Sequence, residues 1–164
     1  MQKALIILLG LLALLSAFAY PAQIGEIAPP FELTDLSGDL VKSGDLKGKV
    51  VFMVFWATWC EQCRTELPEL DILYKKYRKD GLEVVGISLD SSAARLARFL
   101  QKIKPSFRVF HDVKGTVANA YRVSGIPVGV IVDRNGVIGR RITGFGRGFL
   151  PMFEREMKEL LKQR

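Results

Sequence analysis

The six-residue run from Val50 to Phe55, VVFMVF, places the strongest constraint on the fold of this 164-residue chain. The run is too short for a typical helix, and valine and phenylalanine favour extended structure. Because no polar residue alternates within it, we predict a strand that is buried on both faces. Such a strand needs a sheet with other elements packed on both sides, which predicts an α/β fold.

The segments around this strand predict alternating helices and strands. A helical pattern extends from about Trp59 to Lys79, with Gly81 as its stop signal, and Ser91 or Ser92 is expected to cap a helix that ends near Lys104. The remaining pattern predicts hairpins at 31–41 and 127–143, the second turning at Asn135-Gly136, strands at 82–89 and 107–110, and helices at 116–121 and 150–162. We therefore predict a mixed central sheet with helices on both faces and an N-terminal hairpin extension.

Residues 1–19 have the pattern of a secretory signal peptide. Lys3 precedes an apolar run from Ala4 to Leu15, and a small-residue site ends at Ala19. The alternative is a retained membrane anchor, although the apolar run is shorter than the ~20 residues that usually span a bilayer. Residues 20–164 then form one domain. We expect a periplasmic or otherwise extracytoplasmic protein, which is soluble after cleavage and membrane-anchored if the segment is retained.

The net charge of +7 falls by one if the leader with Lys3 is removed. The basic residues are scattered along the chain, a pattern typical of a solvated surface that favours an anionic membrane or an acidic partner. Because no compact basic stripe with interleaved aromatic residues is present, we predict no nucleic-acid binding. Membrane contact is expected only if the N-terminal segment is retained.

The only two cysteines, Cys60 and Cys63, directly follow the buried strand. A disulfide between them closes a loop too small to stabilise the fold much, so we predict a redox couple. Near the N-terminus of the predicted helix, Cys60 gains thiolate character and is the expected attacking nucleophile. Cys63, one turn deeper, is the expected resolving thiol. We expect no cofactor other than this redox-active disulfide.

Two glutamates lie close to the couple. Glu66, three residues after Cys63, flanks the apolar stripe of the predicted helix, where poor solvation raises its pKa and lets it exchange a proton with Cys63. The alternative is an exposed helix residue paired with nearby charges. Glu61 opposes a Cys60 thiolate, which predicts a reduction potential below about −200 mV.

The residues flanking the couple suggest a surface for substrates. We predict that Trp56 and Trp59 form an exposed apolar rim, and that Ile126 and Pro127 adjoin it. Pro127 precedes a predicted strand, where either a cis or a trans turn proline fits.

The sequence offers few further ligands for a metal bound by the cysteine pair. A zinc site lacks a second ligand pair, and a covalent haem site needs histidine where Arg64 stands. A Cu(I) site formed by Cys60, Cys63 and His111 is chemically feasible, so a non-enzymatic Cu(I) metallochaperone stays an alternative. Our prediction is that no metal is bound.

The segments FWATWCEQC, RTELPEL and GIPVGVIVDRNG, with the lead-in IGEIAPPFELTDLSGD, resemble the TlpA/ResA-type thiol-disulfide oxidoreductases of the thioredoxin superfamily. The resemblance extends from Ile24 to the C-terminus. It implies a thioredoxin-like fold, a cis bond before Pro127, a role for Glu66 in acid-base chemistry, and reduction of disulfides in exported proteins. In several relatives the substrate is an apocytochrome c. A membrane thiol-disulfide protein is the implied electron donor.

Three positions depart from the family pattern. Gln62 stands where proline is common, Val128 stands where threonine usually follows the proline, and Val54 replaces the buried aspartate of thioredoxin. A peroxiredoxin-like peroxidase is a second alternative. In those enzymes a threonine lies three residues before the reactive cysteine, and Ala57 occupies that position here.

Overall fold

The computed structural model describes residues 23–144 and 149–163, so the predicted leader at 1–19 lies outside the described residues. The elements follow the predicted order with shifts of at most two residues at their ends. They are β1 (Glu32–Thr34), β2 (Leu40–Lys42), η2 (Ser43–Leu46), β3 (Val50–Trp56), α2 (Glu61–Tyr77), η3 (Arg78–Asp80), β4 (Leu82–Ser88), α3 (Ala93–Ile103), β5 (Arg108–His111), α4 (Thr116–Ala120), β6 (Val128–Val132), β7 (Ile138–Thr143) and α5 (Phe149–Lys162).

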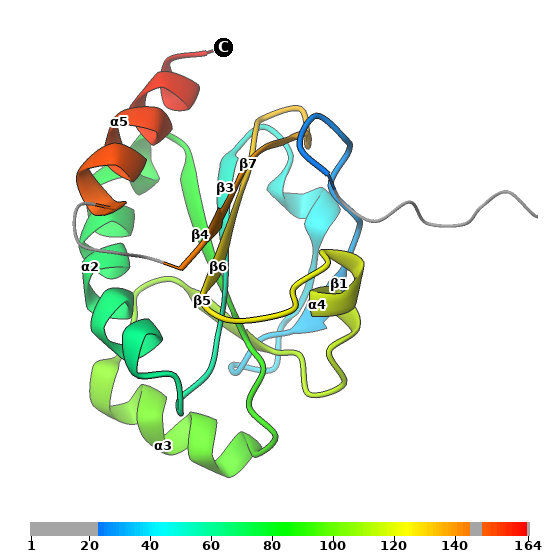
Figure 1. The fold of residues 1–164 in the computed structure, drawn as a ribbon, viewed down its shortest axis with the longest axis vertical. Helices are drawn as coiled ribbons and strands as arrows, with labels where there is room; N and C mark the ends of the chain where they lie inside the picture. The colour runs from blue at the N-terminus through cyan, green and yellow to red at the C-terminus, as the bar shows by residue number, and fades with distance from the viewer. Residues whose placement is uncertain (1–22, 145–148, 164) are drawn as a thin grey trace, which may run out of the picture.

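A five-stranded sheet in the order β5-β4-β3-β6-β7 forms the centre of the molecule (Figure 1). Strand β3 pairs parallel with β4 and antiparallel with β6, so the sheet is mixed as predicted. Every residue of β3 and β4 is buried, which confirms that these apolar runs are covered on both faces. The α/β fold is therefore confirmed.

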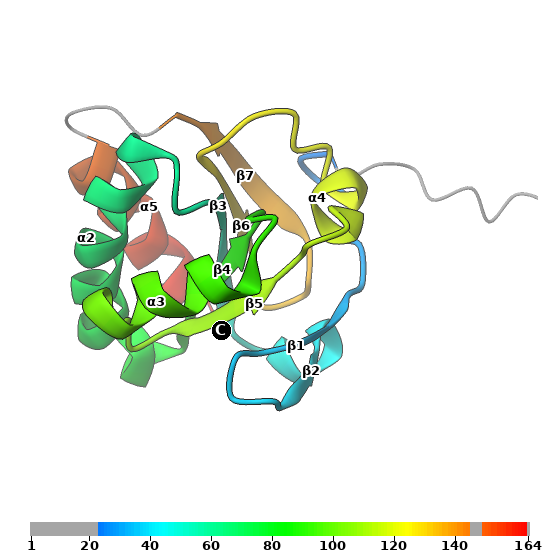
Figure 2. The same ribbon diagram turned by 90° about the horizontal axis from the view of Figure 1, so that it is seen from below.

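Two apolar cores lie on opposite faces of the sheet. Helices α2, α3 and α5 cover one face, and α4 with the β1-β2 hairpin covers the other (Figures 1 and 2). Alternate residues of β3 serve the two cores: Phe52 and Val54 pack under α2, whereas Met53 and Phe55 face α4. This alternation follows from the period-two geometry of a strand.

The turn between β6 and β7 differs from the predicted two-residue hairpin. Gly136 has a positive φ of 83°, but Asn135 is not among the residues with positive φ. Instead, the Asp133 carboxylate accepts the N–H groups of Asn135 and Val137, at 2.9 and 2.8 Å, and closes a longer loop. Aspartate commonly organises turns in this way, and here its hydrogen bonds favour the longer loop over the two-residue turn.

The topology gathers the ends of the central strands at one edge. Because β3, β4 and β5 are parallel, their carboxyl ends share this edge, and the segment before β6 reaches it from the opposite direction. The cysteine pair follows β3, Asp90 follows β4, His111 ends β5 and Pro127 precedes β6. This edge is where a site is expected in an open α/β sheet.

Candidate active site

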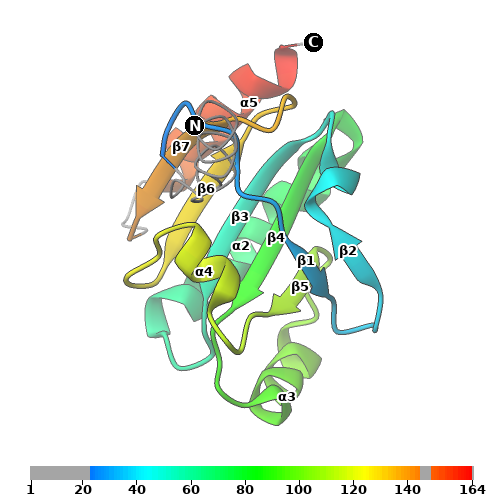
Figure 3. The same cartoon turned by 90° about the vertical axis from the view of Figure 1, so that its right-hand side faces the viewer.

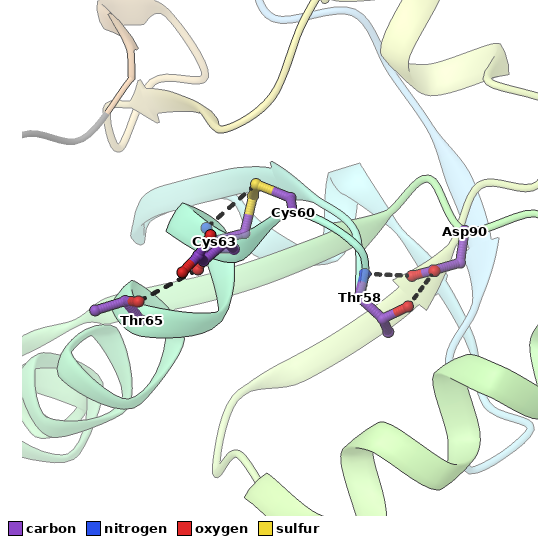
Figure 4. Close-up of a disulfide and its surroundings, with 6 residues drawn as sticks. Thr58, Cys60, Cys63, Thr65 and Asp90 are labelled. Carbon is purple, nitrogen blue, oxygen red and sulfur yellow. Dashed lines mark hydrogen bonds between the residues drawn. A yellow bond between two sulfur atoms is a disulfide. The ribbon is translucent and has the colours of Figure 1, made fainter.

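Cys60 and Cys63 form a disulfide at the N-terminus of α2, with an S–S distance of 2.11 Å and a Cα–Cα distance of 5.3 Å (Figure 4). Cys60 is the N-cap residue, and its sulfur accepts the backbone N–H of Cys63 at 3.2 Å. The helix dipole and this donor both favour negative charge on the Cys60 sulfur. Cys60 is 9% exposed and Cys63 only 2%, so Cys60 is the more accessible of the two.

Glu66 lies one turn beyond Cys63 on α2 and is half-buried. Its Oε2 atom is buried and has no hydrogen-bond partner among the described residues. Burial raises the pKa of this carboxyl to about 7. A hydrogen bond from the Gln62 side chain acts to lower the pKa, and the charge of Glu69 acts to raise it. The predicted poor solvation of Glu66 is therefore confirmed, and the group can exchange a proton near neutral pH.

Gln62 and Glu66 are four residues apart on α2, the spacing at which helical side chains meet. The Gln62 amide is thus the helix's own donor to the Glu66 carboxylate. Proline, which is common at this position in the family that the sequence resembles, has no such side chain. The departure at Gln62 therefore gives this site a hydrogen bond that opposes protonation of Glu66.

A second carboxylate, Asp90, holds the loop that leads into Cys60. It is 1% exposed and accepts the N–H of Thr58 at 2.9 Å and the Thr58 hydroxyl at 2.5 Å (Figure 4). It also accepts the Ser88 hydroxyl at 2.8 Å. Strand β4 is thereby tied to the residues just before the disulfide. Asp90 was not among the residues predicted for the site, although its position directly after a strand parallel to β3 was an available signal.

His111 belongs to this network. Its Nε2 lies 2.6 Å from the carbonyl oxygen of Asp90, and because a carbonyl only accepts, Nε2 carries the proton. Among residues 23–144 and 149–163, no group of three or more His, Cys, Asp and Glu side chains could hold a metal ion. The structure therefore does not bring His111 to Cys60 and Cys63 as the copper alternative required.

The two tryptophans have opposite environments. Trp59 is 62% exposed, as predicted for a rim residue. The prediction that Trp56 also lies on an exposed rim is wrong, because Trp56 is 0% exposed and packs against Phe99 with ring centroids 5.6 Å apart. Trp56 is the last residue of β3, so its side chain continues the alternation of the buried strand. Gly86 of β4 makes room for it, since an added Cβ would lie 3.2 Å from the indole nitrogen.

Ile126 and Pro127 lie at the same edge of the sheet. The Ile126-Pro127 peptide bond is cis, as expected from the resemblance. Val128 pairs with Phe55, so Pro127 lies beside the end of β3, from which the chain continues to Cys60. Ile126 is partly buried and packs against the core that contains both cysteines. The structure thus brings Cys60, Cys63, Glu66, Ile126 and Pro127 to one region.

Comparison with known proteins agrees with this geometry. The AhpC/TSA family model matches residues 24–141. The thiol-disulfide oxidoreductase ResA of Geobacillus kaustophilus is 34% identical over 145 residues, which is 82% of this chain and 83% of that protein. ResA of Bacillus cereus is 35% identical over 122 residues, covering 74% of this chain and 70% of the relative.

Solved structures show the same architecture. A Chlorobium tepidum protein described as a thiol:disulfide interchange protein DsbE superposes with a TM-score of 0.82 at 33% identity, covering 85% of this chain and 99% of that one. A thiol:disulfide interchange protein from a Bacteroides species superposes with a TM-score of 0.73 at 27% identity, covering 87% and 93%.

In the part of the chain that the structure describes, no helix is long and apolar enough to cross a membrane. The sequence match, the superposition and the disulfide at the start of α2 agree. The chain belongs to the AhpC/TSA family within the thioredoxin superfamily and is a thiol-disulfide oxidoreductase of the ResA type.

Proposed function

We propose that this protein is an extracytoplasmic reductase of protein disulfides that uses Cys60 and Cys63 as its only redox couple. The observation that carries the proposal is an N-cap cysteine, more exposed than its partner, on the same helix as a half-buried carboxyl whose pKa is raised to about 7. The Cys60 sulfur is placed to attack a substrate disulfide, and the Glu66 carboxyl is placed to accept the proton of the Cys63 thiol.

The reaction starts from the reduced pair. The Cys60 thiolate attacks one sulfur of a substrate disulfide and forms a mixed disulfide, while the other substrate sulfur leaves as a thiolate and takes a proton. Ionised Glu66 then accepts the proton of Cys63, and the new thiolate attacks the Cys60 sulfur. The second substrate thiol is released, and the two electrons lost by the protein have reduced the substrate.

Residues around the pair have supporting roles in this proposal. Trp59, exposed beside Cys60, offers apolar contact to a bound polypeptide. Ile126 and Pro127 flank the same edge and form the opposite side of the substrate surface. Trp56 contacts no substrate, because it is buried; its ring instead packs against Phe99 in the core.

The cellular setting is part of the proposal. The signal-peptide pattern at 1–19 favours export, by cleavage or as a retained anchor. Outside the cytoplasm, a reductase needs electrons from a dithiol, and we propose a membrane thiol-disulfide protein as the donor. Apocytochrome c, whose thiols must be reduced for haem attachment, is the substrate that we propose first.

The reduction potential of the Cys60–Cys63 couple tests the direction of electron flow. The domain from Tyr20 onward is equilibrated with glutathione and dithiothreitol buffers, and the thiols are counted after alkylation. We expect a potential below about −220 mV. A value near −120 mV would belong to an oxidant and would overturn the proposed reductase activity.

The two alternatives gain no support from the described residues. A Cu(I) carrier lacks its third ligand, since His111 hydrogen-bonds to the carbonyl of Asp90. For a peroxidase, the residue three positions before Cys60 is Ala57, whose side chain has no hydroxyl. Hydrogen peroxide consumption with a dithiol donor would separate a peroxidase from a disulfide reductase.

A further inference from the structure

Two arginines, Arg122 and Arg141, line a pocket of ≈500 Å³ on the α4 face of the sheet. Gln23, Ile24 and the apolar side chains of Val130 and Ile138 complete its lining. Arg122 follows α4, and Arg141 stands opposite Val130 in the β6-β7 register. Figure 3 shows that the start of the described chain, α4 and β7 lie on this side of the molecule.

The positive charges of this pocket have no anionic partner within the described residues. Arg141 donates to the carbonyl oxygens of Tyr121 and Arg122, at 2.5 and 2.7 Å, and forms no ion pair there. The neighbouring carboxylate of Glu26 accepts the N–H of Gln23 instead of an arginine. Burial and the charge of Arg122 lower the pKa of Arg141, so its positive charge lies where it is disfavoured. An anion between the two guanidinium groups would relieve this cost.

The backbone of Arg122 adds a second indication. Its φ is 50°, in the left-handed region that favours glycine after a helix. Arg122 thus places a long charged side chain at a position whose backbone conformation favours glycine, and this residue lines the pocket. Arginine rather than lysine suits a phosphate, because its planar group can donate two parallel hydrogen bonds.

Exposed apolar side chains beside the pocket indicate the source of the phosphate. Ile24 is 64% exposed and Ile27 is 69% exposed, and Ile27 forms a bridge to Val137 just before β7. Ile24 also lines the pocket and lies five residues beyond Ala19, the end of the predicted leader. Aliphatic side chains next to arginines are the combination that binds the interface of an anionic bilayer.

We propose that the pocket of Arg122 and Arg141 binds the phosphate of an anionic phospholipid headgroup, while Ile24 and Ile27 insert among the lipids. This contact would orient the domain on the membrane. Pro127, at the edge with the disulfide, precedes β6, and the pocket residue Val130 lies three positions further along. The disulfide edge therefore stays outside the pocket itself and open to a substrate.

The test is co-sedimentation of the chain from Tyr20 onward with vesicles of phosphatidylcholine, with and without phosphatidylglycerol. The Chlorobium structure matches 85% of this chain along 99% of its own length, so a domain of this extent folds by itself. The variant Arg122→Gly removes one charge and relieves the backbone, so its thermal midpoint should not fall. The charge-matched control is Arg98→Gln, on the exposed face of α3 across the sheet.

We expect wild type to bind only the vesicles that contain phosphatidylglycerol. Arg122→Gly should lower the partition coefficient about 5-fold, and Arg98→Gln less than about 2-fold. Ile27→Ser should also weaken binding without changing the disulfide-reduction rate. Equal losses for Arg122→Gly and Arg98→Gln, or equal binding to both kinds of vesicle, would overturn the proposal. Stabilisation by inorganic phosphate without vesicle binding would also overturn it, since the site would then take a free anion.

Discussion

Two carboxylates, Glu66 and Asp90, flank the disulfide and differ in one respect that separates their roles. Asp90 accepts three hydrogen bonds from Thr58 and Ser88, whereas one oxygen of Glu66 is buried with no partner in the described structure. A carboxylate surrounded by donors is held in place as a structural charge. A carboxylate short of donors holds a proton more readily. The difference teaches that the supply of hydrogen-bond donors separates the carboxylate that positions the loop from the carboxylate that carries a proton.

Removing Asp90 should have the largest effect on the folded protein. In Asp90→Ala, the Thr58 N–H and two hydroxyls lose their acceptor in a buried region, so the free energy of unfolding should fall by about 2–4 kcal/mol. Urea unfolding of the oxidised protein measures this loss. Thr58→Val, which removes only one of the donors, is the matched smaller change. If Asp90→Ala were as stable as wild type, Asp90 would have no structural role that distinguishes it from Glu66.

Removing the charge of Glu66 should affect catalysis instead. Glu66→Gln keeps the shape of the side chain but cannot accept the Cys63 proton, so we expect reduction of a protein disulfide at pH 7 to slow by about 100-fold. Stopped-flow kinetics resolve the second step, release of the mixed disulfide. Glu69→Gln, one turn away and exposed, is the local-charge control; because the Glu69 charge raises the pKa of Glu66, its removal should not slow this step. If both variants slowed that step alike, general charge and not proton transfer would explain the loss.

Protonation of Glu66 also predicts how stability depends on pH. The folded-state pKa of about 7 lies above the ordinary glutamate pKa of 4.5, so the folded protein holds this proton more tightly than the unfolded chain. The contribution is fully present below pH 4.5 and is lost as the pH rises through 7. Because Glu66 is only partly buried, the effect is reduced by solvent screening. Between pH 5 and pH 8, the free energy of unfolding of wild type should fall by about 1 kcal/mol more than that of Glu66→Gln. Parallel urea titrations that show no difference would contradict the raised pKa.

The smallest expected effect concerns Gln62. Its side chain lowers the pKa of Glu66 by donating a hydrogen bond to the carboxylate. Gln62→Ala removes that donor, so the pH at which the mixed-disulfide step is half-maximal should move upward, with little change in the maximal rate. The pH–rate profile of the variant measures this shift. A profile displaced to lower pH would mean that Gln62 favours the protonated acid.

Local patterns predicted most of the fold and the redox pair. The apolar run of β3, the helical spacing after Cys60 and the stop at Gly81 each depend on neighbouring residues, and the structure confirms them. The position of Glu66 beside an apolar helix stripe was equally readable, because helix periodicity places it three residues from Cys63.

The remaining features depend on contacts between distant segments. The sequence near Trp56 looks the same whether β3 ends before or after it, and only packing against Phe99 and Gly86 decides that the indole is buried. Asp90 is 32 residues from Thr58, so its hydrogen bonds required the strand order. The pairing of Arg122 with Arg141 likewise follows from the path of α4 and β7.

The most direct test of the account is a titration of the Glu66 carboxyl in the oxidised protein, followed by carboxyl-carbon NMR and assigned with Glu66→Gln. We expect a midpoint near 7, where the group can both accept and return a proton. A midpoint near the ordinary glutamate value of 4.5 would make Glu66 a solvated carboxylate like any other and would contradict its proposed role at Cys63.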